Sequence, residues 1–277
     1  MNIPFFIAHR GGNQAPENTL EAFKSASKLG AKMCEFDIQL SKDNELIVIH
    51  DESLDRTSSG SGRVRDFDLK DIQKMGDIPS LTEVNNLCQK LNMAMNIEIK
   101  SFEDKNQNIK TAEKLIQWLH SLSLDPGVRR DDEMARTLFL RRHSGEGRNP
   151  GVDIFDGILI SSFDSSLLYL IKQAFPNISL GYLVFINNWD QDWENLKNKI
   201  IKETQELGCL SFNINQEVLT PESIKEIKSC IKTPLVLTYT VNNLERIRFL
   251  KSHGVDGVFI DDLDNLKNIH DPIGPCN

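Results

Sequence analysis

The sequence predicts an α/β protein that folds as a closed (β/α)8 barrel with a small insertion after its second strand. Eight short apolar segments alternate with amphipathic segments of helical periodicity, which is typical of a parallel sheet covered by helices. Several of the apolar segments are almost continuously hydrophobic, as expected of strands buried on both faces. The 277 residues are enough for one barrel that forms a single domain. An open, doubly wound sheet is the alternative that the same pattern allows.

The predicted elements follow one another along the whole chain. Thr220 before Pro221 and Asn243 before Leu244 are typical helix starts, and Gly30 lies where a helix would end. Helices are expected in segments such as Thr19–Leu29, Leu81–Leu91, Thr111–Leu122, Pro221–Ile231 and Leu244–His253. Strands are expected at Phe5–His9, Met33–Ile38, Ala94–Ile99, Gly157–Ile160, Ser179–Val184, Cys209–Phe212, Leu235–Tyr239 and Gly257–Ile260.

One segment departs from the alternation early in the chain. Residues 37–50 have the pattern of a strand, a turn at Asp43-Asn44 and a second strand, which predicts a hairpin in place of a helical crossover. A polar segment rich in glycine and serine follows at Thr57–Val64. We therefore expect residues 51–79 to form a small inserted excursion over the mouth of the barrel.

A second irregular region covers residues 125–152. It contains six of the twelve arginines of the chain and none of its twenty lysines. A basic patch for phosphate-rich partners is one interpretation of this insert. A disordered surface loop that the fold tolerates is the simpler interpretation, because a single solvated charge cluster is a weak signal.

Composition narrows the range of partners. The formal net charge is −8 and the isoelectric point about 5.3, so we expect no affinity for nucleic acid or for anionic membranes. The five cysteines are scattered without a CxxC pair, which fits a reducing compartment. No leader pattern and no apolar run of the roughly 18 residues that span a bilayer occur, so we expect a cytoplasmic protein without stable membrane insertion.

Three acidic residues are the strongest candidates for a metal site. Glu35 and Asp37 are two residues apart in one expected strand, so their side chains point in the same direction, and Glu98 lies in the next strand of the ring. Carboxylates placed together repel one another unless a cation neutralises them. Oxygen ligands favour Mg²⁺ or Ca²⁺ over zinc. A surface salt-bridge face is the alternative, but the apolar neighbours of Glu35 and Asp37 argue against simple exposure.

Two histidines and two basic residues accompany these carboxylates. His9 and His50 each follow an apolar run, where they would lie at the mouth and suit acid–base catalysis near neutral pH. Arg10 offers a planar fork that matches a phosphate, and Lys100 offers a point charge. Salt bridges of Arg10 and Lys100 with the site carboxylates are the competing interpretation.

In their order along the chain, these fragments resemble the motifs of the glycerophosphodiester phosphodiesterase family. The similarity also includes Ser161-Ser162-Phe163-Asp164, Thr240-Val241-Asn242 and Gly254-Val255-Asp256-Gly257, and it spans nearly the whole chain apart from the insert. The principal matches are His9-Arg10-Gly11 with Pro16-Glu17-Asn18-Thr19, Glu35-x-Asp37, His50-Asp51 with Leu54-Asp55-Arg56-Thr57, and Asn96-Ile97-Glu98-Ile99-Lys100.

The resemblance implies metal-dependent hydrolysis of small glycerophosphodiesters to an alcohol and sn-glycerol 3-phosphate on a (β/α)8 barrel. It assigns Glu35, Asp37 and Glu98 to a divalent cation, His9 and His50 to acid and base in an order left open, and Arg10 and Lys100 to the phosphate. Tyr239 replaces a tryptophan that is usual in the family, and Tyr239 and Phe163 are the candidates for the wall that faces glycerol.

The sequence leaves two other functions open. A phospholipase D-like enzyme acting on lysophospholipids would keep the chemistry and change the substrate, and the shortened excursion between Met75 and Pro79 motivates it. A barrel that serves only as a binding module, with the insert as its contact surface, is the alternative from a different class.

Overall fold

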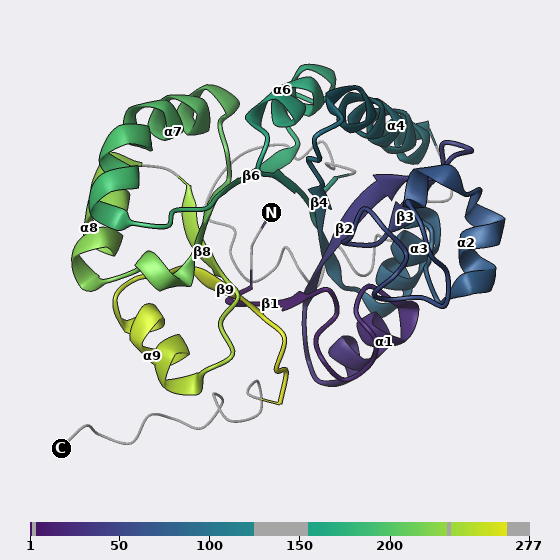
Figure 1. Ribbon diagram of the computed structural model, residues 1–277. Helices are drawn as coiled ribbons and strands as arrows, with labels where there is room; N and C mark the ends of the chain where they lie inside the picture. The colour runs from purple at the N-terminus through teal and green to yellow at the C-terminus, as the bar shows by residue number, and fades with distance from the viewer. Residues whose placement is uncertain (2–3, 125–154, 232–233, 265–277) are drawn as a thin grey trace.

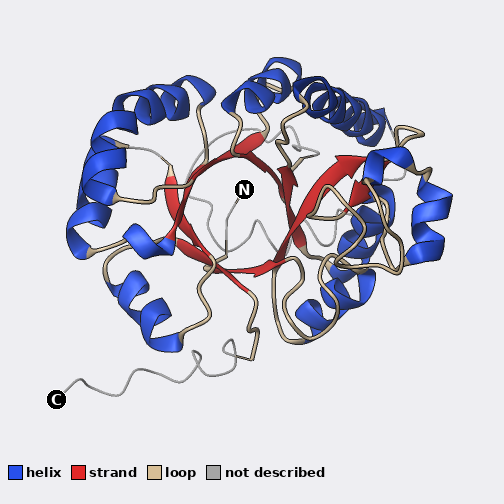
Figure 2. Ribbon diagram, viewed as in Figure 1, coloured by secondary structure: helices blue, strands red, loops and turns tan. Residues whose placement is uncertain are grey.

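Eight parallel strands close into a barrel that helices surround (Figures 1 and 2). The computed structural model describes residues 1, 4–124, 155–231 and 234–264. The strands follow the order β1-β9-β8-β7-β6-β5-β4-β2, and β1 also pairs with β2. This closure confirms the predicted barrel and excludes the open sheet. The nine strands of the described residues are β1 (Phe6–His9), β2 (Met33–Leu40), β3 (Leu46–Val48), β4 (Ala94–Ile99), β5 (Ile158–Ser162), β6 (Ser179–Val184), β7 (Ser211–Asn215), β8 (Leu235–Tyr239) and β9 (Gly257–Ile260).

Helices α8 and α9 begin at the capping residues that the sequence indicates. The side chains of Thr220 and Asn243 accept hydrogen bonds from backbone N–H groups in the first turns of α8 and α9. None of the described helices combines the length and apolar character needed to cross a bilayer. The helical elements are α1 (Leu20–Lys28), η1 (Val64–Asp66), α2 (Leu69–Met75), α3 (Leu81–Leu91), α4 (Lys105–Leu124), α6 (Ser165–Ala174), η2 (Trp189–Trp193), α7 (Glu194–Leu207), η3 (Gln216–Val218), α8 (Pro221–Cys230) and α9 (Leu244–Ser252).

Two predicted boundaries were wrong by several residues. Helix α4 begins at Lys105, well before the predicted Thr111, because its polar first turn carries no apolar periodicity. Strand β7 covers Ser211–Asn215 in place of Cys209–Phe212. The strand ends later than predicted because it contains two buried asparagines, Asn213 and Asn215. A pattern of apolar residues does not assign asparagines to a strand.

The predicted hairpin is present beside the barrel mouth. Strand β3 pairs antiparallel with β2, with Ile38 opposite Val48. The segment that follows, residues 51–79, contains η1 and α2 and packs around its own small core. That core includes Ile47, Ile49, Leu54, Val64, Ile72 and Ile78. The arginine-rich insert at 125–152 lies outside the described residues.

Strand β2 explains how acidic residues enter the barrel interior. All eight of its residues are buried, and side chains alternate between the two faces. Cys34, Phe36 and Ile38 belong to the main apolar core of the protein, which places the intervening Glu35 and Asp37 on the opposite, interior face. A separate apolar cluster inside the barrel comprises Ile7, Met33, Leu159, Leu237 and Phe259.

A glycine turn after β1 shapes the entrance to the barrel. Gly11 has φ +85°, and a Cβ there would lie 2.7 Å from the Cβ of Ala22 in α1. Gly12 has φ +82°, and its Cβ would meet the side chain of Leu263 at 2.5 Å. Both positions therefore require glycine, because a side chain at either one would collide with its neighbours. The chain can then turn close to α1 at Gly11, with Arg10 beside β2.

Gly11→Ala is expected to destabilise the protein by roughly 2–5 kcal/mol, because the left-handed backbone costs about 1–2 kcal/mol and overpacking adds about 1–3 kcal/mol. Gly30→Ala is the matched control. Gly30 has φ +98° but no atom within 4 Å of its Cβ position, so only the backbone cost applies. Denaturant unfolding of the two variants measures the difference, and equal destabilisation would contradict the role of close packing at Gly11.

Candidate active site

Three buried carboxylates meet at one level of the barrel. Glu35 and Asp37 come from β2, and Glu98 comes from β4, in register with Asp37. One oxygen of each lies within 4.8 Å of the others. The structure thus brings together the three residues that the sequence selected as metal ligands.

Two cations partly neutralise this cluster. Arg10 Nε lies 3.3 Å from Asp37 Oδ2, and Lys100 Nζ lies 2.7 Å from Glu98 Oε1 and 3.1 Å from Asp37 Oδ1. The backbone N–H of Arg10 donates to Glu35 Oε2 at 3.1 Å. Arg10 and Lys100 therefore form the salt bridges that were the competing interpretation, and they do so within the predicted site.

The positive charges of Arg10 and Lys100 do not balance the negative charge of the three carboxylates. Burial, followed by the negative charge of Asp37, raises the pKa of Glu35 to about 8, and the same two causes raise the pKa of Glu98. The pKa of Asp37 is lowered, because Lys100 and Arg10 outweigh the effect of its burial. Glu35 Oε1 is buried and has no hydrogen-bond partner among the described residues. An unpartnered carboxylate oxygen beside two further carboxylates fits a hard divalent cation.

The metal-free protein is expected to lose stability as pH rises from about 4.5 to about 8. Glu35 binds its proton more tightly in the folded state than at its ordinary pKa of 4.5, so its contribution is complete below that value and is lost as pH rises through about 8. Thermal unfolding across this range measures the effect. A saturating divalent cation should remove the loss, and a metal-free protein that gains stability over this range would contradict it.

His9 is held by a carboxylate that directly follows β9, the last strand of the barrel. Its Nδ1 lies 2.7 Å from Asp261 Oδ1, and Asn242 Nδ2 donates to Asp261 Oδ2 at 2.9 Å. Its Nε2 lies 3.9 Å from Glu35 Oε2. Burial alone would lower the pKa of His9, but the hydrogen bond that His9 donates to Asp261 and the charge of Glu35 more than compensate, and the pKa is raised.

His50 is held by a chain of ion pairs. Its Nδ1 lies 2.6 Å from Asp51 Oδ1, and Asp51 in turn is paired with Arg56. Arg56 also donates two hydrogen bonds of 2.7 Å to Glu17, which accepts a third from Arg10 at 3.1 Å. Burial lowers the pKa of His50, with the charge of Lys100 acting in the same direction. The two imidazoles are therefore shifted in opposite directions.

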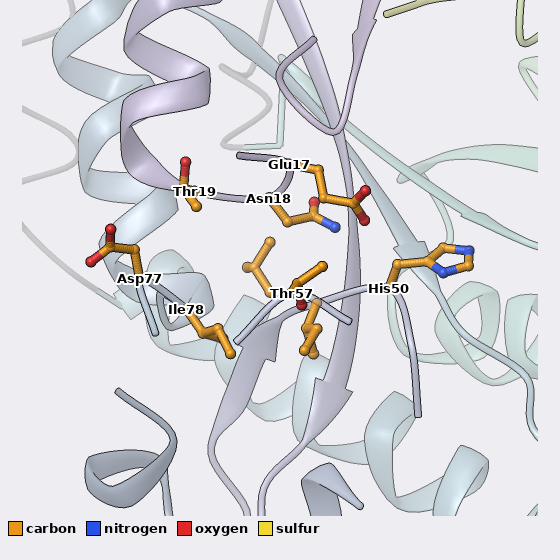
Figure 3. A pocket seen from close by; sticks show the side chains of 9 residues that line it. Glu17, Asn18, Thr19, His50, Thr57, Asp77 and Ile78 are labelled. Carbon is orange, nitrogen blue, oxygen red and sulfur yellow. The ribbon is translucent and has the colours of Figure 1, made fainter. Parts of the chain in front are cut away.

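Sequence reasoning missed two buried amides that support these groups. Asn18 Nδ2 donates to Asp37 Oδ2 at 3.0 Å, and Gln39 Nε2 lies within 3.1 Å of the carbonyls of Ile49, His50 and Asp51. Figure 3 shows Asn18 among the side chains that line one pocket, and His50 also lines this pocket. The period of two along β2 could have indicated Gln39, because it follows Asp37 on the same face.

Aromatic side chains lie at the carboxyl ends of strands β5 and β8. The ring centroids of Phe163, after β5, and Tyr239, on β8, are 6.0 Å apart in an edge-to-face arrangement. Tyr239 Oη donates to the carbonyl of Val184 at 2.7 Å, and burial raises the Tyr239 pKa. Phe163 is 43% exposed and Phe185, after β6, is 56% exposed. The two aromatic residues selected from the sequence thus lie together at the mouth.

Comparison with known proteins agrees with this geometry. A glycerophosphodiester phosphodiesterase of Caldanaerobacter subterraneus is 31% identical over 277 residues, which cover 95% of this chain and 96% of the relative. Glycerophosphodiester phosphodiesterase 1 of Mus musculus is 35% identical over an alignment that covers 89% of this chain and 74% of the relative.

The solved structures extend this similarity. A phosphodiesterase of Oleispira antarctica in complex with the product sn-glycerol-3-phosphate matches with a TM-score of 0.72 and 25% identity, over 98% of both chains. The model of the Glycerophosphoryl diester phosphodiesterase family matches residues 9–265, which include every site residue described above. The chain therefore belongs to the glycerophosphoryl diester phosphodiesterase family and is a phosphoric diester hydrolase of that family.

Proposed function

We propose that the protein hydrolyses glycerophosphodiesters to an alcohol and sn-glycerol 3-phosphate with the help of a divalent cation. The observation that carries this proposal is the cluster of Glu35, Asp37 and Glu98 next to His9, with His50 close enough to help lower the pKa of Asp37. The product that the Oleispira antarctica structure contains supports the same substrate class.

Glu35, Asp37 and Glu98 are proposed to hold the cation, which would be Mg²⁺ or Ca²⁺ because all three ligands are carboxylate oxygens. When bound, the cation supplies positive charge to the phosphoryl oxygens. Arg10 and Lys100 pair with Asp37 and Glu98, so they lie where they can add their own charge to a phosphate. Electrostatic stabilisation of this kind is the main contribution that a protein makes to phosphoryl transfer.

The counter-charges of the two histidines favour different roles. Asp51, the partner of His50, is itself neutralised by Arg56, so His50 is suited to be the neutral imidazole that accepts a proton from the attacking oxygen. No lysine or arginine of the described residues forms a salt bridge with Asp261, which leaves its charge available to a protonated His9. His9 then donates its proton to the leaving alkoxide. The opposite pKa shifts of the two imidazoles agree with this assignment.

Asp261→Asn is expected to lower kcat about tenfold to a hundredfold with little change in KM. Asp261 orients His9 without reaching the phosphate, so its loss removes part of the 10²–10⁴-fold that a positioned acid contributes. Steady-state kinetics measure this split, and Asp262→Asn is the control that removes an equal charge from the adjacent position. An unchanged kcat, or a loss confined to KM, would contradict a positioning role.

A panel of phosphodiesters tests the proposed function. Release of sn-glycerol 3-phosphate from glycerophosphocholine and glycerophosphoethanolamine should require a divalent cation and should stop when a chelator is added. The same assay on His9→Ala separates this activity from that of a contaminating enzyme. Turnover that persists in chelator would contradict the metal dependence.

A second substrate class is lysophospholipids, and the exposed rings of Phe163 and Phe185 at the mouth favour it. An acyl chain could lie against these rings, whereas a deacylated substrate would leave them exposed to water. Turnover of acylated and deacylated substrates of the same head group decides between the two. Equal or faster turnover of the acylated substrate would favour the lipid.

A further inference from the structure

A row of small polar residues crosses the barrel interior beside the carboxylates. The register of the strands places Glu98 next to Ser161, Ser161 next to Gly181, and Gly181 next to Ser211. Asn213 follows two residues after Ser211 on the same face of β7, because Phe212 and Ile214 belong to the core outside the barrel. We call Asn96, Ser161, Gly181, Ser211 and Asn213 the polar row.

Most of the side-chain polar atoms of this row have no hydrogen-bond partner in the part of the chain that the structure describes. Asn213 is fully buried, yet among the described residues neither its Oδ1 nor its Nδ2 has a hydrogen-bond partner. Ser211 Oγ and Asn96 Oδ1 are also buried and unpartnered. Among the described residues, the only hydrogen bond within the row is the one that Asn96 Nδ2 donates to Ser161 Oγ at 2.8 Å. Buried amides and hydroxyls are normally hydrogen-bonded, so four such atoms in one place call for a ligand.

Gly181 lies where these polar atoms converge. A Cβ at Gly181 would lie 2.8 Å from Ser211 Oγ, 3.1 Å from Asn213 Nδ2 and 3.4 Å from Ser161 Cβ. The polar groups from β5 and β7 therefore converge on the one position of β6 that lacks a side chain. Barrel interiors are ordinarily filled by branched apolar residues at this level, as the cluster around Ile7 and Leu237 is.

We propose that the polar row is a buried water-binding site. Its ligand is one or more ordered water molecules, which accept from Asn213 Nδ2 and donate to Asn213 Oδ1, with Ser211 and Asn96 as further partners. Water is the ligand that suits these groups, because they are neutral, mix donors with acceptors, and are enclosed by the barrel. Ser161 is adjacent to Glu98, so this water lies beside the proposed metal ligands.

Two measurements on the full-length protein test this site. A crystal structure at high resolution should contain a water molecule within hydrogen-bond distance of both Asn213 and Ser211. Magnetic relaxation dispersion of water nuclei, which counts long-lived internal waters, should show at least one fewer in Gly181→Ala than in the unmodified protein. The added methyl group would lie between Ser211 and Asn213, where it would displace the water, and the Ser211 hydroxyl can rotate away from it.

Gly257→Ala is the matched control. Gly257 is also a barrel-strand glycine, and its Cβ would meet the side chain of Leu237 at 2.8 Å, in the apolar part of the interior. This variant should keep the full number of internal waters. A well-ordered Asn213 with no water beside it, or direct hydrogen bonds from Asn213 to Ser211 and Asn96, would overturn the proposal even if neither glycine variant folds. Equal water counts in Gly181→Ala and the unmodified protein would overturn it as well.

Discussion

Glu35→Gln is expected to lower metal-dependent phosphodiester hydrolysis by at least roughly 10³-fold, which corresponds to about 4 kcal/mol of transition-state stabilisation. Glutamine keeps the size of the side chain but removes the charge and leaves a weaker ligand. In the absence of metal the same variant should be more stable than the unmodified protein above neutral pH, because it removes one of three mutually repelling carboxylates. A divalent cation should raise the unfolding temperature of the unmodified protein much more than that of the variant.

These opposite effects separate a metal site from a structural ion-pair network. Glu222→Gln, which removes an exposed carboxylate from the first turn of α8, is the control and should change neither quantity. If Glu35→Gln destabilised the metal-free protein and left the response to the cation intact, Glu35 would be a structural partner of His9 and Arg10.

His9→Ala and His50→Ala should each reduce kcat for glycerophosphocholine by about 10²–10⁴-fold, the range typical of a lost general acid or base. They should differ when the leaving group changes. A p-nitrophenyl phosphodiester releases a phenolate that needs no protonation, so it should restore much of the rate of the variant that lacks the acid. We expect this recovery in His9→Ala and not in His50→Ala, because Arg56 neutralises the partner of His50 and not the partner of His9.

The ratio of kcat on the two substrates is the decisive quantity, since it cancels losses that come from misfolding. His253→Ala, on the surface after α9, controls for the loss of an imidazole outside the site. Recovery in His50→Ala alone would reverse the two roles. No recovery in either variant would mean that protonation of the leaving group does not limit the reaction.

The barrel and its acidic cluster could be predicted because both depend on regular spacing. The period of two in a strand places Glu35 and Asp37 on one face, and the closure of parallel strands brings Glu98 next to them. The charge balance was not predictable, because whether Lys100 and Arg10 contact the carboxylates or a bound phosphate depends on side-chain geometry.

Groups from distant parts of the chain escaped sequence reasoning for a related reason. Asp261 contacts His9 across 252 residues of sequence, and nothing in the local pattern around Asp261 points to an imidazole. Asn213 was hidden because a buried amide interrupts the apolar run by which strand β7 would be recognised. In both cases the partner of a polar group is set by the closure of the barrel.

An anomalous difference map from crystals grown with Mn²⁺ tests the central claim most directly. We predict a peak bound by one carboxylate oxygen from each of Glu35, Asp37 and Glu98, on the side of the cluster that faces His9. A map without a peak at this cluster, with Lys100 and Arg10 still paired to the three carboxylates, would contradict the assignment of the metal centre and of the chemistry that rests on it.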